Sequence, residues 1–296
     1  MQLGALLPLG DIGGEPAVLR EYAQAAEAAG YDFLEAPDHV MGANPASRPN
    51  DERAGAGYYQ DPFVLFGYLA GVTPKLGFST GVLILPQRQT ALVAKQAACL
   101  DVLCGGRFRL GIGVGWNEVE FVGLNENFHN RGRRSEEQVQ VMQALWSNEY
   151  VKFKGRWHTL DDAGISPRPP SGKVPVWYGG HVEQTLQRVA KWGDGWMPNA
   201  YPPDQSALDV FGQLRKLTEQ AGRDPAKVGI EVWVSMGSGS EADWAKDAKF
   251  WKSAGASHLC LTTTFNRRHH KRIPGHGIGD HIAALRRYQR AVADAL

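Results

Sequence analysis

Apolar segments of strand length alternate with amphipathic segments of helical periodicity along the whole 296-residue chain. Strands joined by crossover helices are parallel. A doubly wound sheet shows the same alternation, but eight consecutive units without a linker, closing on a C-terminal helix, favour a (β/α)8 TIM barrel. We therefore predict one α/β domain over residues 1–296, with strands near 3–9, 31–37, 76–85, 108–114, 174–178, 195–198, 228–235 and 258–263.

Three segments interrupt this regular pattern and are predicted to be loop insertions, near residues 41–60, 115–134 and 149–173. The first is rich in Gly, Pro, Asn and Ser and exceeds the usual loop length, so it is either an active-site loop or disordered. The second is expected to be irregular up to a helix that begins near Ser135. The third contains a hairpin-like stretch followed by a proline-rich one.

The composition narrows the class of partner. Thirty-two Lys and Arg side chains nearly balance 31 Asp and Glu, which argues against nucleic acid as the main partner. Three cysteines are too few for a disulfide framework, and none lies in a zinc-site pattern. The sequence shows neither a signal peptide nor an apolar run of ~20 residues, which a bilayer span needs. We expect a cytoplasmic protein that acts on a small molecule and binds no metal.

The carboxyl ends of barrel strands meet at one mouth, so residues that follow the strands are the candidate site residues. His39 follows the second strand and is a candidate acid/base near neutral pH, while Asp38 beside it is a candidate for holding polar ligand groups. Glu118 and Glu120 follow the fourth strand, and Glu118 is the second candidate catalytic residue. A histidine that only caps its strand and a solvated carboxylate are the alternatives.

Glycines after two strands suggest a phosphate or ring site. Gly179 and Gly180 precede a helix, where backbone N–H groups and the helix dipole favour an anion. The alternative is a tight turn that needs positive φ. The run 111–115 lacks the dinucleotide-binding GxGxxG spacing. Its glycines, Gly115 among them, are better explained as thinning the strand end to admit a flat ring.

The run Arg267–Arg272 follows the last strand and contains His269 and His270. A metal site is disfavoured there by the adjacent cationic side chains. A solvated or anion-attracting loop is the expected structure.

In combination, several blocks resemble the luciferase-like monooxygenase superfamily. They are Leu85–Pro86, Ala94–Gln96, Leu100–Arg107, Leu110–Asn117, Glu120–Phe121, Arg131–Arg134, Val174–Gly180 and Gly193–Pro198. Asp38–Val40 and Ser79–Leu83 are most similar to the branch of coenzyme F420-dependent oxidoreductases. The resemblance implies the same barrel and a homodimer.

The resemblance also implies site residues. A non-prolyl cis peptide that backs the deazaflavin ring in this branch matches Gly81–Val82, and the segment near the cofactor phosphate matches Gly179–His181. His39 matches the histidine assigned as the acid/base in several relatives. Val114 occupies a position that resembles the site of a phosphate-binding arginine in bacterial luciferase. The absence of that cation at position 114 favours F420 over FMN.

Two departures limit the resemblance. The stretch Met41–Asn44 lacks the tryptophan of the sugar-phosphate and alcohol dehydrogenases in this branch, and their strand-1 glutamate has no clear match, so neither specificity is carried over. The sequence predicts F420-dependent hydride transfer to or from a small organic substrate. A reduced-FMN-dependent monooxygenase with a partner flavin reductase, and a non-catalytic flavin-binding protein, are the alternatives.

Overall fold

The computed structural model describes residues 1–51 and 54–296. Eight parallel strand positions form a closed barrel, because the strands pair in the order β3-β2-β1-β11-β10-β9-β8-β5 and β5 pairs back with β3. The prediction of a (β/α)8 barrel is confirmed. The strands are β1 Gln2–Leu6, β2 Phe33–Ala36, β3 Gly77–Thr80 with β4 Leu83–Ile84, β5 Phe108–Gly113, β8 Val176–Gly179, β9 Gly195–Met197, β10 Gly229–Ser235 and β11 His258–Thr262.

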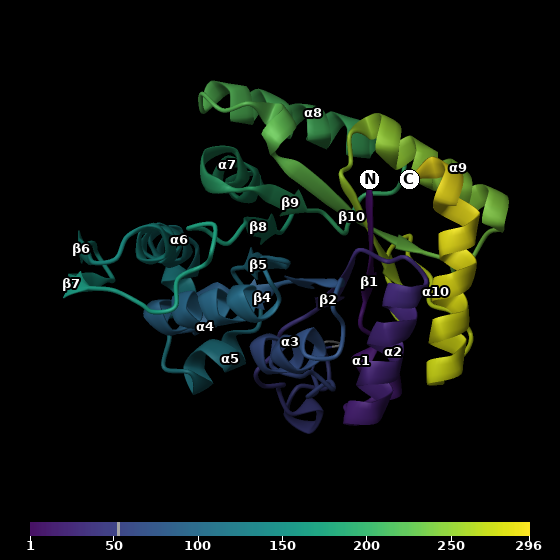
Figure 1. The fold of residues 1–296 in the computed structure, drawn as a ribbon, viewed down its shortest axis with the longest axis horizontal. Helices are drawn as coiled ribbons and strands as arrows, with labels where there is room; N and C mark the ends of the chain where they lie inside the picture. Colours follow the sequence, from purple (N-terminus) through teal and green to yellow (C-terminus); the bar gives the residue numbers. More distant parts are fainter. Residues whose placement is uncertain (52–53) are drawn as a thin grey trace.

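The helices surround the strands (Figure 1). They are α1 Leu9–Ile12, α2 Pro16–Ala28, α3 Pro62–Ala70, α4 Thr90–Leu103, α5 Glu118–Gly123, α6 Arg131–Ser147, α7 Glu183–Trp192, α8 Gln205–Gln220, α9 Glu241–Ala254 and α10 Ile278–Val292. The last helix packs between α2 and α9, and the Met1 ammonium donates to the Leu296 carbonyl at 3.2 Å. Within the described residues, no helix has both the length and the apolar character needed to cross a membrane.

Alternation along the strands separates the core into two parts. On β10, Val232 and Val234 are buried on the side that the helices cover, whereas Glu231 and Trp233 bond to residues of other strands across the barrel interior. The interior therefore carries polar side chains close to the barrel mouth.

The strand predicted near 76–85 is interrupted, which corrects the sequence-based boundary. β3 ends at Thr80 and β4 continues beside β5 alone. The peptide bond between Gly81 and Val82 is cis, which confirms the cis peptide that the family resemblance implied at this position. The Thr80 hydroxyl donates to the Gly111 carbonyl at 2.6 Å, which fixes the break against β5. Periodicity does not show such a break, because the residues on both sides remain apolar.

The second insertion is more regular than predicted. Instead of an irregular stretch, residues 115–134 contain α5, a short 3-10 turn and the start of α6, which begins at Arg131 rather than near Ser135. The Arg131 guanidinium holds the 3-10 turn against the start of α6, because it donates to the Phe128 carbonyl at 2.8 Å and lies 3.7 Å from the Phe128 ring centre.

The other two insertions are found near the predicted positions. A two-stranded antiparallel ribbon, β6 Val151–Lys154 and β7 Thr159–Ala163, confirms the hairpin in 149–173. The loop 41–60 has one short 3-10 turn, Pro45–Ser47, and is otherwise without helix or strand in its described part; residues 52 and 53 lie outside the described residues.

Candidate active site

A pocket of about 290 Å³ opens at the carboxyl ends of the barrel strands, and we refer to it as the mouth pocket. Seven residues that the sequence predicted to bind a cofactor line it: Gly81, Val82, Val114, Gly115, Gly179, Gly180 and His181. Nine further residues complete its wall: Glu35, Ile84, Gly113, Trp116, Val182, Thr185, Met197, Asn199 and Trp233. Its lining is mainly apolar with few polar groups, as is usual for a cofactor site.

Val82 forms a ridge in this pocket, and glycines surround it. A Cβ on Gly113 would lie 2.5 Å from a Val82 methyl group, and a Cβ on Gly179 would lie 2.8 Å from the other methyl. Both distances are shorter than real Cβ contacts allow. The glycines therefore let three strand ends approach closely and leave a flat opening above Val82.

The turn after β8 presents backbone N–H groups at the start of α7. Gly180 has φ +120°, which favours glycine, and the Trp196 indole donates to its carbonyl at 2.8 Å. A Cβ on Gly180 would approach the Thr185 hydroxyl to 3.0 Å. This turn has the geometry of an anion site at a helix N-terminus.

Burial, with a smaller effect from Arg268, lowers the pKa of His181 in this turn. Its Nε2–H donates to Asn199 Oδ1 at 2.8 Å, and its buried Nδ1 has no partner among the described residues. No lysine or arginine lines the mouth pocket in the part of the chain that the structure describes. Arg188 lines an adjoining hollow with Val114, Gly179 and Thr185, where its guanidinium pairs with Glu136 at 2.8 Å.

His39 pairs with Glu120. The His39 Nδ1 lies 3.3 Å from Glu120 Oε1, which also accepts from the backbone N–H of Val40 at 2.8 Å. Burial would raise the pKa of Glu120, but hydrogen bonds from His39, the Met41 amide and Gln87 hold it below its ordinary value. Glu120 is therefore a carboxylate that orients His39 with the proton on Nδ1, and Nε2 is the atom left for proton exchange.

Aromatic rings flank His39. The Tyr59 ring centre lies 4.9 Å from that of His39, and the Trp116 ring centre lies 5.8 Å away. These residues line a hollow of about 140 Å³ with part of loop 41–60, and we refer to it as the His39 hollow. Trp116 also lines the mouth pocket. The two spaces are therefore neighbours, with an aromatic wall in common.

The structure corrects the role predicted for Asp38. Its carboxylate is 3% exposed and accepts from Arg88 at 2.8 Å and from the Ile84 N–H at 3.1 Å. Arg88 also pairs with Asp61 at 3.0 Å. Asp38 therefore fixes β4 behind the mouth pocket and has no oxygen directed at a ligand. Asp38 and His39 lie beyond β2, which ends at Ala36, and their side chains contact different partners, Arg88 and Glu120.

Glu118, the second predicted catalytic residue, does not line the mouth pocket. Its side chain is 60% exposed, lies 3.9 Å from His129, and lines a surface hollow that shares Trp116 and Asn117 with the His39 hollow. Glu120, two residues on, lies on the buried side of α5 and contacts His39. The sequence identified both glutamates, but it contained no signal that separated them before α5 was known to be a helix.

Sequence reasoning missed Glu35 and Trp233, which both line the mouth pocket, whereas Asn199, which also lines it, was expected there because it follows the sixth predicted strand. A signal existed for the first of these. Glu35 stands in the middle of a buried apolar strand, where an ionised carboxylate is rarely found without a partner.

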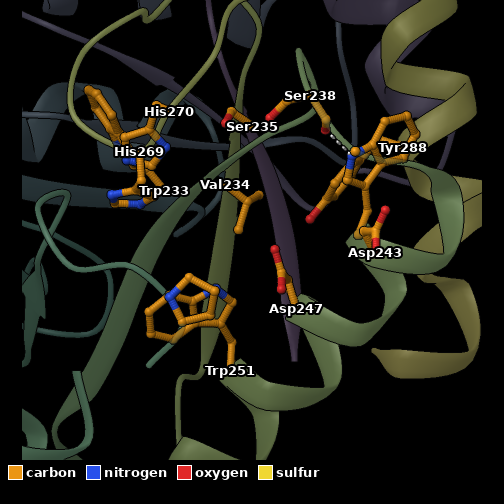
Figure 2. A pocket seen from close by; sticks show the side chains of 13 residues that line it. Trp233, Val234, Ser235, Ser238, Asp243, Asp247, Trp251, His269, His270 and Tyr288 are labelled. Carbon is orange, nitrogen blue, oxygen red and sulfur yellow. Dashed lines mark hydrogen bonds between the residues drawn. The ribbon is translucent and has the colours of Figure 1, made fainter. Parts of the chain in front are cut away.

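A second cavity of about 290 Å³ lies beside β10, between α9, α10 and the 264–277 segment (Figure 2). Trp251 and Asp247 on α9 face it from one side, and His269 and His270 from the other. The helices thus leave a polar and aromatic groove outside the barrel.

The Arg267–Arg272 run is only partly the solvated loop that was predicted. His270 is 1% exposed and its Nε2–H donates to the Asn199 carbonyl at 3.1 Å, while Arg272 pairs with Asp11 at 2.8 Å. Arg267 and Arg268 remain exposed. Burial lowers the pKa of His270 to about 4, so this histidine is neutral at physiological pH.

The mouth pocket at the carboxyl ends of the barrel strands thus lies beside the hollow that contains His39. The sequence profile described as luciferase-like monooxygenase matches residues 4–295, and the chain belongs to this family. An uncharacterised protein of Mycobacterium tuberculosis is 35% identical over 211 residues, covering 68% of this chain and 71% of that protein.

Relatives with named activities fall into two groups. The pyrimidine monooxygenase RutA of Allorhizobium ampelinum is 32% identical over 245 residues, covering 75% of this chain and 64% of the relative. The F420-dependent hydroxymycolic acid dehydrogenase of M. tuberculosis is 28% identical over 239 residues, covering 79% of this chain and 63% of the relative. The family thus includes oxidoreductases and monooxygenases.

Solved structures share the fold. An F420-dependent secondary alcohol dehydrogenase, in complex with an F420–acetone adduct, superposes with a TM-score of 0.73 at 22% identity and 98% coverage of both chains. A riboflavin lyase with modified FMN and riboflavin superposes with a TM-score of 0.70 at 16% identity, covering 86% of this chain and 66% of the other chain.

Proposed function

We propose that this protein is a coenzyme F420-dependent oxidoreductase that transfers hydride between the deazaflavin and a small organic substrate. The observation that carries the proposal is that Trp116 lines both the mouth pocket and the His39 hollow, so the two spaces lie side by side. A ring in the first space and a substrate in the second would meet beside a histidine oriented by a carboxylate.

The residues present fit this cofactor. Val82 and the glycines Gly113 and Gly179 give a flat apolar support for a ring. The N–H groups of the Gly180 turn and the Thr185 hydroxyl would hold a phosphate at the start of α7. Unpartnered His181 Nδ1 would accept a hydrogen bond from the bound group.

When bound, the deazaflavin supplies the hydride chemistry, and the protein supplies binding, orientation and proton transfer. His39 Nε2 would give a proton to the substrate, or take one from it, as the hydride moves in the matching direction. Glu120 would stabilise the protonated imidazole through the Nδ1–H hydrogen bond. Tyr59 and Trp116 would exclude water from the reacting atoms.

The size of the His39 hollow, about 140 Å³, favours a small substrate. His39 favours a substrate with one polar group that exchanges a proton while the cofactor exchanges hydride.

A reduced-FMN-dependent monooxygenase is the second candidate, and the 32% identity to a pyrimidine monooxygenase favours it. The lining of the mouth pocket argues for F420 instead. The terminal phosphate of FMN is a dianion, and a charge-assisted contact is typically about twice as strong as a neutral one. Val114 offers no such cation, and Arg188, which lines an adjoining hollow with Val114 and Gly179, is already paired with Glu136 at 2.8 Å.

We expect F420 to bind at least roughly tenfold more tightly than FMN, a difference of about 1.4 kcal/mol. Fluorescence or calorimetric titration of the purified protein with both cofactors, oxidised and reduced, measures this. The reduced F420 complex should consume dioxygen slowly. Binding of FMN at low micromolar concentration while F420 fails to bind would overturn the proposal and establish the monooxygenase candidate.

A further inference from the structure

A cluster of ionisable side chains lies inside the barrel beneath the mouth pocket. Glu35 on β2 and Glu231 on β10 are both fully buried, and their carboxyl groups lie with the Cys260 thiol in one cluster, within 4.8 Å of one another. Arg109 on β5 reaches Glu231 at 2.6 Å. Further titratable groups act on this cluster: His258 on β11 acts on Glu231, and Tyr22 and Tyr31 interact with Cys260.

The hydrogen bonds of the two carboxyl groups leave one oxygen on each without a partner. Glu35 Oε1 accepts from the Trp233 indole at 2.9 Å, and Glu231 Oε2 accepts from Arg109. Glu35 Oε2 and Glu231 Oε1 have no partner among the described residues if both groups are ionised. A proton between the two carboxyl groups satisfies both oxygens, and two adjacent buried carboxylates are otherwise strongly disfavoured.

Arg109 decides which carboxyl group carries the proton. Its guanidinium stabilises a charge on Glu231, and it is held over the Phe33 and Trp177 rings at 4.4 and 4.5 Å. Burial, followed by the charge of Glu231, raises the pKa of Glu35 well above its usual range. Burial and Arg109 together lower the pKa of His258 to about 3, so it adds no charge.

We propose that Glu35 and Glu231 share one proton, and that the neutral Glu35 carboxyl is a positioning residue that supports the floor of the mouth pocket. Glu35 lines this pocket, and a Cβ on Gly81 would lie 2.1 Å from its carboxyl carbon. The carboxyl group therefore packs directly against the Gly81 backbone and holds the Trp233 indole of the same wall. This role rests on the proposed function, because it assigns the wall to a cofactor site.

Charge explains why the neutral form matters for binding. An ionised Glu35 would place a second negative charge beneath a pocket that receives an anionic cofactor. It would also repel Glu231, whose single charge is balanced by Arg109. We therefore expect cofactor affinity to fall when the shared proton is lost.

The pH dependence has a definite sign. A carboxyl group whose pKa is raised by folding contributes its full stability below its unfolded pKa and loses that contribution as the pH rises through its folded pKa. The wild-type protein should therefore lose both thermal stability and cofactor affinity toward alkaline pH. The loss of affinity should reach at most about tenfold per pH unit for one proton.

Glu35→Gln tests the proposal, because an amide donates to Glu231, accepts from Trp233 and stays neutral. We expect Glu35→Gln to lose the fall in F420 affinity that the wild-type protein shows as the pH rises. Infrared spectroscopy of the cofactor-free protein should show a protonated carboxyl band that disappears in Glu35→Gln. The matched control, Glu120→Gln, should keep this band, since Glu120 is ionised.

Several outcomes decide the matter. Identical alkaline profiles of affinity in wild type and Glu35→Gln would overturn the positioning role. Absence of the band in wild-type protein at neutral pH, or a stoichiometric divalent metal held by Glu35, Glu231 and Cys260, would overturn the shared proton. If Glu35→Gln does not fold, loss of the wild-type band on raising the pH supports the shared proton, and a pH-independent band contradicts it. The band is read without cofactor, so failure of F420 to bind overturns the proposed function and not the shared proton.

Discussion

Replacing His39 with alanine is expected to slow turnover by roughly 10²–10⁴-fold, the usual loss for a missing general acid or base, while the affinity for cofactor stays within about twofold. His39 lines the hollow beside the mouth pocket rather than the mouth pocket itself. Removing its imidazole therefore takes away the proton-transfer group without touching the cofactor support. Single-turnover rates and a parallel cofactor titration measure the two effects separately.

Two further substitutions sharpen this test. Glu120→Gln removes the carboxylate that orients His39, and we expect a smaller loss of rate with an altered pH profile, because the imidazole remains. Glu118→Gln is the matched control, since Glu118 is exposed and paired only loosely with His129. The turnover rate of Glu118→Gln should stay within about twofold of the wild-type rate. Full activity of His39→Ala, measured where chemistry limits the rate, would remove His39 from the mechanism.

The fold was predictable from sequence because a parallel barrel repeats one simple pattern. Each strand is buried on both faces, so its apolar run is continuous, and each helix returns the chain to the same end. Strand ends were less predictable. Residues 76–85 look like one strand in the sequence, yet the strand is interrupted at Gly81–Val82. The periodicity of the segment does not show this interruption, because the hydrogen bond that fixes it joins Thr80 to Gly111, far along the chain.

The candidate site was predictable where a barrel strand end alone places the residue. Gly179–His181 and Gly81–Val82 line the mouth pocket for that reason. Asp38 was misplaced because its role depends on Arg88, 50 residues away, and no local pattern shows that pairing. Glu35 and Glu231 escaped notice because their partner Arg109 comes from a third strand, and only barrel closure brings the three together.

Gly179→Asp is expected to weaken cofactor binding by roughly 100-fold, or about 3 kcal/mol, in a protein that still folds. Gly179 lines the mouth pocket at the end of β8, one residue before the turn that would hold the phosphate. A carboxylate there would repel the anion, and its Cβ would press on Val82, which supports the ring. Gly179→Ala carries the same Cβ without the charge, so the difference between the two variants isolates the electrostatic part.

A matched control is available on the outer helices. Gly212 lies within α8, and a Cβ there would meet no other atom within 4 Å. Gly212→Asp adds the same charge far from the mouth pocket and should leave cofactor affinity within about twofold of wild type. Thermal unfolding of all three variants checks that they fold. If Gly179→Asp is folded and binds the cofactor as tightly as Gly212→Asp does, the phosphate is held elsewhere, and the Gly180 turn is a structural turn only.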